Sequence, residues 1–302
     1  MVIINTSTER AKTWSILSLI DWSSEHLSSK GFESPRLTAE LMLAQVLGFG
    51  RIELYTHFDQ VLTAEQLAAY KALLTRRLAH EPVQYIVGET AFMGLRFFVD
   101  SRVLIPRPET EILVEQVIAH CKNTASGAMR ILDIGTGSGN ISVSLAKHCP
   151  GCEVLTLDIS ADALSVAGRN IQLHGVGDRV TMAQCDFLRD DPSPGQFDII
   201  VSNPPYISST EFGLLPLEIR EYEPVISATD HADGLTFYRR IAGQATRLLQ
   251  SNGWVFLEVA YDQALAVQEI LSRSGLHNIG TVKDYSGIER VVKAQRLQYE
   301  IS

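Results

Sequence analysis

The segment Asn203-Pro204-Pro205-Tyr206 combines residue types that could bind a flat, nitrogen-containing group. Its two consecutive prolines remove two backbone donors and fix φ, and the first of them holds Asn203 in an extended geometry. The loop therefore offers two acceptors, the Asn203 side-chain oxygen and the Pro204 carbonyl, while Tyr206 can lie against the flat face of the bound group. Two acceptors would orient an amide or amino nitrogen and favour the charge that develops as it takes up a methyl group. A proline turn without any chemistry is the alternative interpretation.

A glycine-rich turn, Gly135-Thr136-Gly137-Ser138-Gly139, follows a short apolar stretch that contains Asp133. Glycines allow positive φ and let a ligand approach the backbone closely. Asn140 stands where a dinucleotide site would have its third glycine, and the turn lacks the Lys and Ser/Thr of a phosphate-binding loop. The spacing therefore favours a nucleoside ligand with an amino-acid tail over a pyrophosphate. A tight turn that binds nothing is the alternative.

Acidic residues follow the next two strands that the sequence predicts. Asp158 lies roughly 20 residues beyond the glycine turn, where a carboxylate can accept both hydrogen bonds of a ribose diol. Capping of the helix after Ser160 is the alternative role for Asp158. Asp186 and Phe187 follow the third strand and could supply an adenine contact and an apolar surface, although Phe187 could also be a core residue.

Strands and helices alternate after Met129, and this alternation must position the candidate residues. We predict strands near residues 130–134, 153–157, 180–183, 197–202 and 254–259, and helices near 140–148, 161–174, 234–249 and 263–272. The order is typical of an α/β protein with a Rossmann-like, doubly wound, mainly parallel sheet. In such a sheet, ligands bind outside the carboxyl ends of the strands, which is where the candidate residues fall.

The residues before this region indicate two smaller parts. Residues 1–81 predict a small helical bundle, because capping signals at Ser34-Pro35 and Thr63-Ala64-Glu65-Gln66 precede amphipathic stretches. Residues 82–107 are expected to form a β-hairpin connector, with strands at 84–88 and 95–99 around Met93-Gly94. Residues 108–302 then form the catalytic domain. The helical part could recognise a substrate or serve only as a scaffold.

Composition and charge narrow the class of protein. The chain has 302 residues, of which 45% are hydrophobic, and a formal net charge of −9. There are 8 basic and 10 acidic residues through Glu89, and 18 and 25 beyond it. Neither part is basic, which argues against a nucleic-acid substrate. No apolar run approaches the roughly 20 residues that span a bilayer, and the N-terminus does not resemble a secretory signal. We therefore expect a cytoplasmic protein without a membrane partner.

The cysteines and histidines do not indicate a metal site. The histidines show no paired-ligand spacing, so we expect no metal. Cys149 and Cys152 match a redox-type C-x-x-C, but they lie in a Pro-Gly turn before a predicted strand instead of opening a helix after one. We interpret the pair as incidental.

The glycine turn and the Asn-Pro-Pro-Tyr segment together resemble methyltransferases that act on planar nitrogens, including adenine amino-methyltransferases and glutamine amide methyltransferases. Four further segments resemble the release factor glutamine methyltransferase family (HemK/PrmC type): residues 82–89, 103–111, 222–224 and 233–235. The resemblance is best over about residues 82–293, and the helical content before this region agrees with it. Two departures are Phe187, where some members have tryptophan, and Glu289, where aspartate is usual.

The resemblance implies a class I methyltransferase fold and the cofactor S-adenosylmethionine, which leaves as S-adenosylhomocysteine. It implies that the substrate is the glutamine of the Gly-Gly-Gln motif in class I peptide chain release factors, methylated at N5. The expected cofactor-binding residues are Asp133, Gly135, Thr136, Gly137, Ser138, Gly139, Asp158, Asp186, Phe187 and Asn203. The expected catalytic residues are Asn203, Pro204, Pro205 and Tyr206.

Three other functions use the same residues. The first is an adenine or guanine amino-methyltransferase acting on DNA or RNA, which the acidic charge disfavours. The second is an enzyme that methylates glutamine in a large-subunit ribosomal protein, and the third is a binding module without catalysis. We do not interpret Arg107, Glu109 and Glu111 as an acid/base set, because an amide nitrogen need not lose its proton before it is methylated. We expect these charges to order the hairpin, a loop lid or a partner surface.

Overall fold

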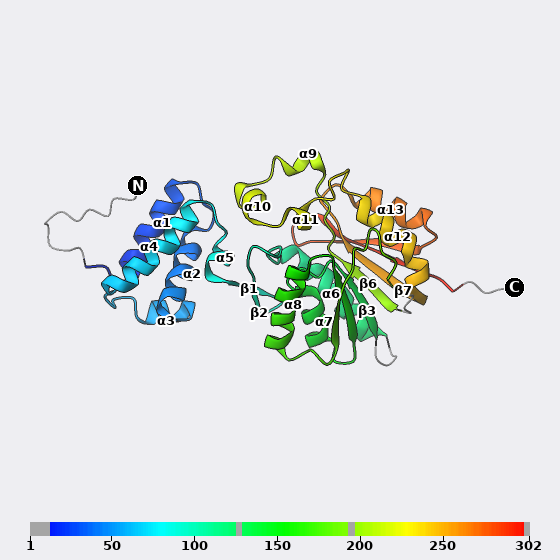
Figure 1. Cartoon of the computed structure of the whole chain (residues 1–302), viewed down its shortest axis with the longest axis horizontal. Coiled ribbons are helices and arrows are strands. Elements are labelled where there is room, and N and C mark those ends of the chain that lie inside the picture. The colour runs from blue at the N-terminus through cyan, green and yellow to red at the C-terminus, as the bar shows by residue number, and fades with distance from the viewer. Residues whose placement is uncertain (1–12, 125–128, 193–196, 299–302) are drawn as a thin grey trace. The chain divides into compact units, whose positions relative to one another are not determined.

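A computed structural model describes residues 13–124, 129–192 and 197–298, and these form two compact units (Figure 1). The first unit extends to Gly88 and the second begins at Glu89. Each unit contains a hydrophobic core, one in the first and two in the second. The fold is a helical N-terminal bundle followed by a Rossmann-like α/β domain, as the sequence predicts.

The first unit is a bundle of helices, and one of its two predicted capping signals is confirmed. Pro35 opens the second helix as predicted, but Ser34 before it has φ of 45° and its side chain makes no capping hydrogen bond. Thr63 accepts from the backbone of Gln66 while Gln66 accepts from the backbone of Thr63, which forms a capping box. Gly48 adopts the left-handed conformation that ends the second helix. The helices are α1 (Ile16–Ser29), α2 (Pro35–Leu47), α3 (Arg51–Thr56), α4 (Ala64–Leu78) and α5 (Val83–Val87).

The strand predicted over residues 84–88 is wrong, because these residues form helix α5 (Val83–Val87). The β-branched and aromatic run that suggested a strand places Tyr85 and Ile86 in buried positions on a short helix instead. Gly88, at φ 78°, ends this helix and donates its backbone N–H to the carbonyl of Gln84. Tertiary packing has overridden local β propensity here.

The predicted hairpin turn at Met93-Gly94 is confirmed, with strands β1 (Glu89–Phe92) and β2 (Leu95–Phe98) on either side of it. Met93 and Gly94 have φ of 51° and 71°, as a two-residue hairpin turn of this kind requires. Phe92 and Phe97 are buried in one of the cores of the second unit. The hairpin therefore packs as part of the α/β domain.

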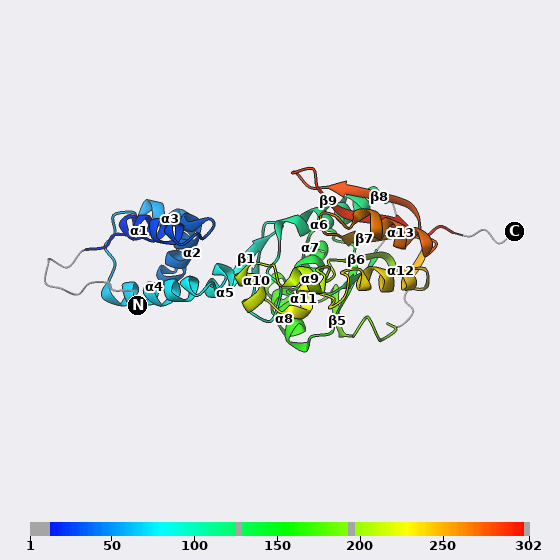
Figure 2. The same cartoon turned by 90° about the horizontal axis from the view of Figure 1, so that it is seen from above.

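The main sheet has seven strands in the order β5-β4-β3-β6-β7-β9-β8. Strand β9 runs antiparallel to the other six. Figure 2 shows β8 and β9 toward one edge of the sheet and β5 toward the other. The strands are β3 (Arg130–Ile134), β4 (Glu153–Asp158), β5 (Val180–Gln184), β6 (Phe197–Ser202), β7 (Leu249–Glu258), β8 (His277–Lys283) and β9 (Glu289–Gln295).

Alternate residues of the central strands enter different cores, as the period of two in a strand requires. Ile131 of β3 and Phe256 of β7 face a core with helices α6 (Pro108–Asn123), α7 (Asn140–His148) and α8 (Ala161–His174). Leu132 and Val255 face the opposite core, with α12 (Thr236–Leu248) and α13 (Ala264–Arg273). Helices thus cover both faces of the sheet (Figure 1). Within the described residues, no helix has the length and apolar character needed to cross a membrane.

Three features were not predicted. Helix α3 follows α2 in the first unit, the hairpin of β8 and β9 completes the sheet, and three short helices lie between β6 and α12: α9 (Ser209–Phe212), α10 (Leu217–Tyr222) and α11 (Val225–Ala228). Each short helix has only four to six residues, so it carries little hydrophobic periodicity.

Candidate active site

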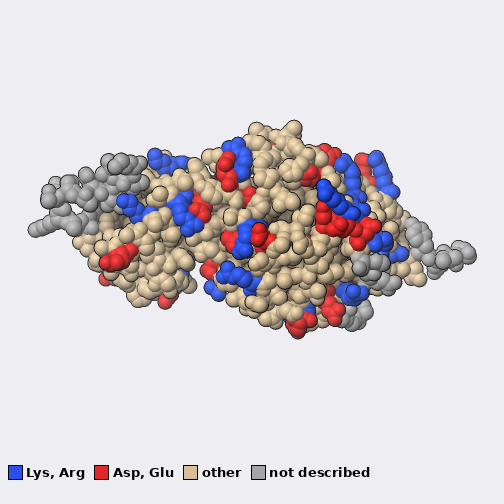
Figure 3. Space-filling model, in the orientation of Figure 1, with Lys and Arg blue, Asp and Glu red and all other residues tan. Residues whose placement is uncertain are grey.

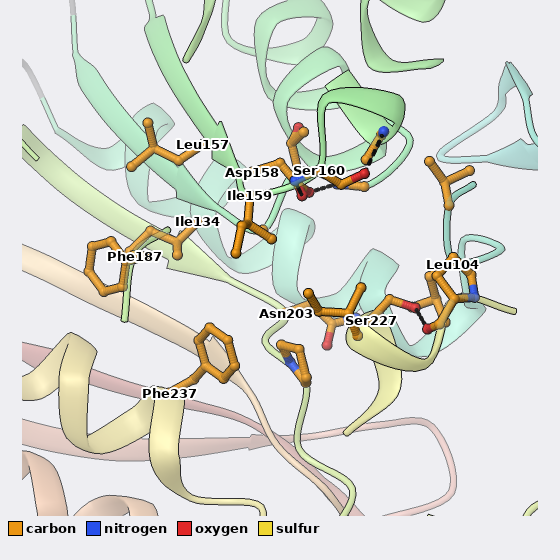
Figure 4. Close-up of a pocket in the computed structure, with 18 of the residues that line it drawn as sticks. Leu104, Ile134, Leu157, Asp158, Ile159, Ser160, Phe187, Asn203, Ser227 and Phe237 are labelled. Atoms are coloured by element: carbon orange, nitrogen blue, oxygen red, sulfur yellow. Dashed lines mark hydrogen bonds between the residues drawn. The ribbon is translucent and has the colours of Figure 1, made fainter. Parts of the chain in front are cut away.

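A cavity of about 360 Å³ lies at the carboxyl ends of strands β3, β4 and β6 in the second unit. This volume is within the range of about 300–1,000 Å³ that is typical of small-molecule sites. Figure 4 shows Ile134, Phe187 and Phe237 on one side of the cavity, Leu104 and Ser227 on the other, and Asp158 and Asn203 between them. Of the residues predicted for the site, the cavity is lined by Gly135, Thr136, Gly137, Ser138, Asp158, Asp186, Phe187, Asn203 and Pro205.

The glycine turn is fixed in a conformation that leaves space on the side that faces the cavity. The backbone N–H groups of Gly135 and Thr136 both donate to the carbonyl of Leu157, at 2.8 and 3.0 Å, which fixes the turn to the neighbouring strand. Gly135, Gly137 and Gly139 all have positive φ. A Cβ atom at Gly135 would meet nothing closer than 4.0 Å and one at Gly137 would meet nothing within 4 Å, so both positions leave room for a ligand.

Gly139 has a different role from the other two glycines. It does not line the cavity, and a Cβ atom there would come within 3.2 Å of the Ala167 side chain on α8. Its glycine therefore allows the turn to pack against that helix. The side chain of Asn170, also on α8, ties the turn to the hairpin: it donates to the carbonyl of Ser138 and exchanges hydrogen bonds with the backbone of Phe98.

Asp158 ends strand β4 and faces the cavity with a carboxylate that already has two backbone partners. It accepts from Gly137 N–H at 3.0 Å and from Ser160 N–H at 2.9 Å. Burial raises the pKa of Asp158, and the backbone hydrogen bonds oppose this. Because each carboxylate oxygen has further acceptor capacity, the group can also bind a ligand diol.

An apolar slot continues from Asp158 into the sheet, lined by Ile134, Leu157, Ile159, Phe187 and Phe237 (Figure 4). Phe187 is only 4% exposed, and it belongs to a hydrophobic core while it also lines the cavity, so its position is compatible with both interpretations. Arg240 donates to the carbonyl of Phe187 at 2.9 Å and fixes this end of the slot.

Asp133 does not line the cavity, although it was predicted to bind the cofactor. It is completely buried, where it accepts from the hydroxyl of Thr156 at 2.8 Å and from that of Thr136 at 3.4 Å. Burial raises the pKa of Asp133 to about 7. By accepting the hydrogen bond from Thr136, Asp133 helps to hold the glycine turn in place.

The Asn-Pro-Pro-Tyr segment leaves β6 and enters the cavity with Asn203 and Pro205, while Pro204 and Tyr206 do not line it. The Asn203 side-chain nitrogen donates to the hydroxyl of Thr110 at 3.0 Å, which leaves the Asn203 oxygen available as an acceptor. Tyr206 packs against a hydrophobic core, and its hydroxyl lies 3.5 Å from Oε1 of Glu258. The Tyr206 ring therefore anchors the loop to the hydrophobic core.

The charges near residue 107 have structural partners. Arg107 donates to Glu223 at 2.5 Å, which connects the loop before α6 to the segment of short helices. Burial raises the pKa of Glu223, and the charge of Arg107 opposes this. Glu111 accepts from the backbone N–H of Met93 at 2.5 Å and so holds the hairpin turn. These contacts agree with the expectation that the charges order the hairpin and a loop over the site.

Sequence reasoning missed several residues that line or support the cavity. Thr110 stands between two glutamates that drew attention as charges, and Glu258 ends a predicted strand to which we assigned no site residue. Asp230 also lines the cavity and accepts from the backbone N–H groups of Ala232, Gly234 and Thr236. A polar residue directly after a buried strand was the available signal for Glu258, as it was for Asp158.

The fold and the cavity define an S-adenosylmethionine-dependent methyltransferase of class I. A family model described as a methyltransferase domain matches residues 125–285, and one described as the PrmC N-terminal domain matches residues 18–88. The chain belongs to the release factor glutamine methyltransferase family. It is 41% identical to the release factor glutamine methyltransferase of Geobacter sulfurreducens, over 94% of this chain and 98% of that protein.

Two further comparisons agree. The release factor glutamine methyltransferase of Chlorobaculum tepidum is 41% identical over 92% of this chain and 96% of that protein. The crystal structure of a methyltransferase from Pyrococcus furiosus has a TM-score of 0.50 at 18% identity, covering 78% of this chain and 100% of that chain. The structural likeness concerns the fold alone, and it supports the class I assignment.

Proposed function

We propose that the protein transfers a methyl group from S-adenosylmethionine to the N5 amide nitrogen of the glutamine in the Gly-Gly-Gln motif of class I peptide chain release factors. The observation that carries this proposal is the presence of Asn203 and Pro205 in the same cavity as the glycine turn and Asp158. The names of the two relatives support a release factor as the substrate.

The residues of the cavity fit S-adenosylmethionine. The open backbone at Gly135 and Gly137 suits its amino-acid end, Asp158 suits the ribose diol, and the apolar slot beside Phe187 suits adenine. Asp186 lines the same cavity, and we propose that it contacts the adenine. When bound, the cofactor supplies an electrophilic methyl group attached to a positively charged sulfur.

The acceptors of the Asn-Pro-Pro-Tyr loop would orient the glutamine amide. An amide nitrogen is a poor nucleophile because its lone pair is delocalised into the carbonyl. Hydrogen bonds from its two N–H groups would go to the Asn203 side-chain oxygen and to the carbonyl of Pro204, the next residue in the chain, which is not part of the cavity lining. These bonds would hold the nitrogen in place and stabilise the positive charge that develops on it. No general base is required, because the nitrogen becomes acidic once it carries the methyl group.

We propose that residues 1–81 recognise the substrate, that residues 82–107 connect the two parts, and that residues 108–302 carry out the transfer. The cavity is lined by the second unit alone, so the helical bundle is not needed to build it. A family-specific N-terminal model matches residues 18–88, which supports a role in choosing the partner. A substrate that works in translation also supports our expectation of a cytoplasmic protein.

A nucleic-acid amino-methyltransferase is the main alternative, since the same loop could orient the amino group of adenine or guanine. The net charge of −9 disfavours it. On the face shown in Figure 3, basic and acidic side chains are interspersed, whereas a nucleic-acid surface concentrates basic ones. The ribosomal-protein alternative shares the chemistry and differs only in the partner.

The test is methyl transfer from labelled S-adenosylmethionine to a purified class I release factor, a large-subunit ribosomal protein fraction, total RNA and duplex DNA, assayed in parallel. Peptide mass spectrometry then locates the product. We expect label on the glutamine of the Gly-Gly-Gln motif, and no label when that glutamine is replaced. Label on nucleic acid alone would overturn the proposed substrate and keep the cofactor site.

The role of the helical bundle has its own test. A binding protein selected against residues 18–88 should raise KM for the release factor while leaving the affinity for S-adenosylhomocysteine unchanged. Unchanged kinetics with the bundle covered would favour a scaffold instead.

A further inference from the structure

The side chain of Gln263 connects three segments that meet at the end of the Asn-Pro-Pro-Tyr loop. Its amide nitrogen donates to the carbonyl of Tyr206 at 2.8 Å and to that of Gly234 at 3.5 Å. Its amide oxygen accepts from the backbone N–H of Ala260 at 3.3 Å. Gln263 does not line the cavity, and the contacts proposed for substrate and cofactor do not involve it. This amide therefore joins the loop to the turn before α12 and to the residues that follow β7.

The partners of Gln263 fix which way its amide points. A backbone N–H can only donate, and a backbone carbonyl can only accept. If the amide were turned over, its NH₂ group would face the Ala260 N–H and its oxygen would face the Tyr206 carbonyl, so both hydrogen bonds would be lost. The Tyr206 carbonyl therefore has a donor whose identity and position are both determined.

The loop depends on its two ends for its position. Pro204 and Pro205 have no backbone N–H, so neither can tie the loop to its surroundings as a donor. At the first end, the side chain of Asn203 donates to the hydroxyl of Thr110 at 3.0 Å. The contacts at the second end must then fix where the rest of the loop lies.

The second end is held from two directions. The backbone N–H of Ile207 donates to the carbonyl of Ala228 at 3.0 Å, on the short helix α11. From the other direction Gln263 holds the carbonyl of Tyr206, and Gln263 lies between β7 and α13, which pack in a hydrophobic core of the second unit. The contact from Gln263 therefore refers the loop to the sheet and its covering helices.

We propose that Gln263 is a positioning residue for methyl transfer: it holds the Tyr206 carbonyl and, through the loop, the acceptors of Asn203 and Pro204 at the place where the substrate nitrogen binds. The inference rests on the proposed function, because that function gives the two acceptors their partner. Gln263 acts only through the loop and is not a catalytic residue.

The stability of helix α13 does not account for Gln263. The residue occupies the N-cap of this helix, yet its side chain makes no capping hydrogen bond. Ser, Thr, Asp and Asn are the preferred N-caps, because their short side chains accept from the N–H groups of the first turn. Gln263 instead directs a longer side chain to Tyr206 and Gly234. A residue that served the helix alone would be one of the shorter ones.

Gly234 leaves the space that this contact needs. Its φ is 78°, and a Cβ atom there would lie 2.8 Å from the Gln263 side-chain nitrogen and 2.3 Å from the Tyr206 carbonyl oxygen. Any residue with a Cβ atom would therefore push the amide and the carbonyl away from the turn. The glycine and the glutamine form one arrangement around the end of the loop.

The first experiment compares Gln263→Asn with Gln268→Asn in the full chain, with the release factor as substrate. Gln263→Asn keeps the amide and shortens the side chain by one CH₂ group, so it can cap α13 but cannot reach Tyr206 as the wild type does. We expect kcat to fall by about 10- to 100-fold, as for a misplaced reacting group. The melting temperature should stay the same or rise, since asparagine is a better N-cap. KM and the affinity for S-adenosylhomocysteine should change little.

Gln268→Asn is the matched control, because it makes the same change inside the same helix at a residue that does not line the cavity. Asparagine is a poorer helix former than glutamine, so the melting temperature should fall slightly. We expect kcat to stay at the wild-type value. The two variants should thus separate turnover from stability in opposite directions.

The second experiment uses Gln263→Glu, which keeps the length of the side chain. The ionised carboxylate cannot donate to Tyr206, so kcat should fall at pH 8 by about 10- to 100-fold. A protonated carboxyl group can donate again, and the ratio of variant to wild-type kcat should therefore rise as the pH is lowered. The ratio cancels the titrations that both proteins share, including those of Tyr238, whose hydroxyl lies 3.4 Å from the Gln263 oxygen, and of Glu258.

The third experiment needs no substrate. Labelling with ¹³C-carbonyl tyrosine and ¹⁵N-isoleucine selects two carbonyls, those of Tyr85 and Tyr206, because each of these tyrosines precedes an isoleucine. The Tyr206 signal, assigned by its loss in Ile207→Val, should shift in Gln263→Asn and stay constant in Gln268→Asn. The Tyr85 signal, from the first unit, should stay constant in both and serves as an internal reference.

The inference is overturned if Gln263→Asn keeps wild-type kcat, if its kcat falls only in step with its melting temperature, or if its Tyr206 signal does not shift. Equal loss of kcat in Gln268→Asn, or no recovery of Gln263→Glu at low pH, would also contradict it. A wild-type protein that methylates only nucleic acid would refute the proposed substrate. The Tyr206 signal, and kcat measured with that nucleic acid, would still decide the positioning role.

Discussion

Asn203 has a donor and an acceptor on one side chain, and Thr110 already engages the donor at 3.0 Å. Replacement by alanine removes the acceptor without filling the space. For Asn203→Ala we expect kcat to fall by roughly 10²–10³-fold, the range found when one preorganised hydrogen-bonding group is removed. Binding of S-adenosylhomocysteine, measured by calorimetry, should weaken much less. Retained turnover would remove Asn203 from its proposed role.

Asp158 is the second residue for which a single substitution tests one proposed contact. In Asp158→Asn one oxygen becomes a donor, which opposes both the Gly137 N–H and a ligand hydroxyl. We expect the dissociation constant for S-adenosylhomocysteine to rise by about 10- to 100-fold, as for a lost charge-assisted hydrogen bond. Asp178→Asn is the matched control, since Asp178 does not line the cavity and its side chain is 73% exposed. Equal effects of the two substitutions would contradict a special role for Asp158.

At the scale of elements, the turn before α12 limits how far the catalytic loop can move. Gly234 has φ of 78°, and a Cβ atom there would lie 2.3 Å from the carbonyl oxygen of Tyr206. Gly234→Ala must therefore displace the end of the loop, and we expect a drop in kcat of roughly 10- to 100-fold together with a lower melting temperature.

Gly243→Ala is the control for this prediction. Gly243 lies within α12, where a Cβ atom would meet nothing within 4 Å. It should raise stability by about 0.5–1 kcal/mol and leave kcat unchanged. If Gly234→Ala keeps wild-type kcat, the position of the Tyr206 carbonyl is not important for the reaction.

The elements that carry the site were predictable because strong local signals mark them. The glycine turn and Asn203 directly follow the buried strands β3 and β6, Asp158 ends β4, and Asp186 lies two residues after β5, so the fold rule for parallel sheets places them together. Asp133 and Tyr206 were harder to interpret, because a residue within or next to a loop motif can point into the cavity or into the core. Thr110 on α6 is hydrogen-bonded to Asn203, 93 residues further along the chain, and no local pattern indicates that contact.

Helix α5 and the hairpin of β8 and β9 were missed for a related reason. Five residues are too few for helical periodicity to compete with the β propensity of Tyr85, Ile86 and Val87. Strand β9 pairs with β7, which lies about 30 residues or more before it in the sequence, and β8 pairs with β9. Tertiary partners, which local propensity does not contain, decided both cases.

At the scale of the whole molecule, two buried carboxyl groups should make stability depend on pH. Burial raises the pKa of Asp133 from 3.8 to about 7 and that of Glu258 from 4.5 to about 7. Between these limits the folded state binds more protons than the unfolded state, so the free energy of unfolding should fall as the pH rises from about 4 to 7. The loss should be on the order of a few kcal/mol.

Hydrogen exchange in β3 and β7 is the appropriate measurement, because it reports on the second unit alone. The double variant Asp133→Asn, Glu258→Gln should flatten the dependence above pH 5, since neither amide titrates. A wild-type protection profile that rises over this range would contradict the prediction. Such a rise would mean that groups other than Asp133 and Glu258 dominate the pH dependence of stability.

The two acceptors proposed at the start of the Asn-Pro-Pro-Tyr loop would also set the stoichiometry of the reaction. A primary amide has two N–H groups, one for each acceptor, whereas an amide that already carries a methyl group has one. The product therefore leaves one acceptor without a hydrogen, and its new methyl group occupies the place where that hydrogen pointed. The loop would therefore distinguish a primary amide from an amide that already carries a methyl group. We expect addition to stop after a single methyl group, with the modified side chain bound more weakly than the unmodified one.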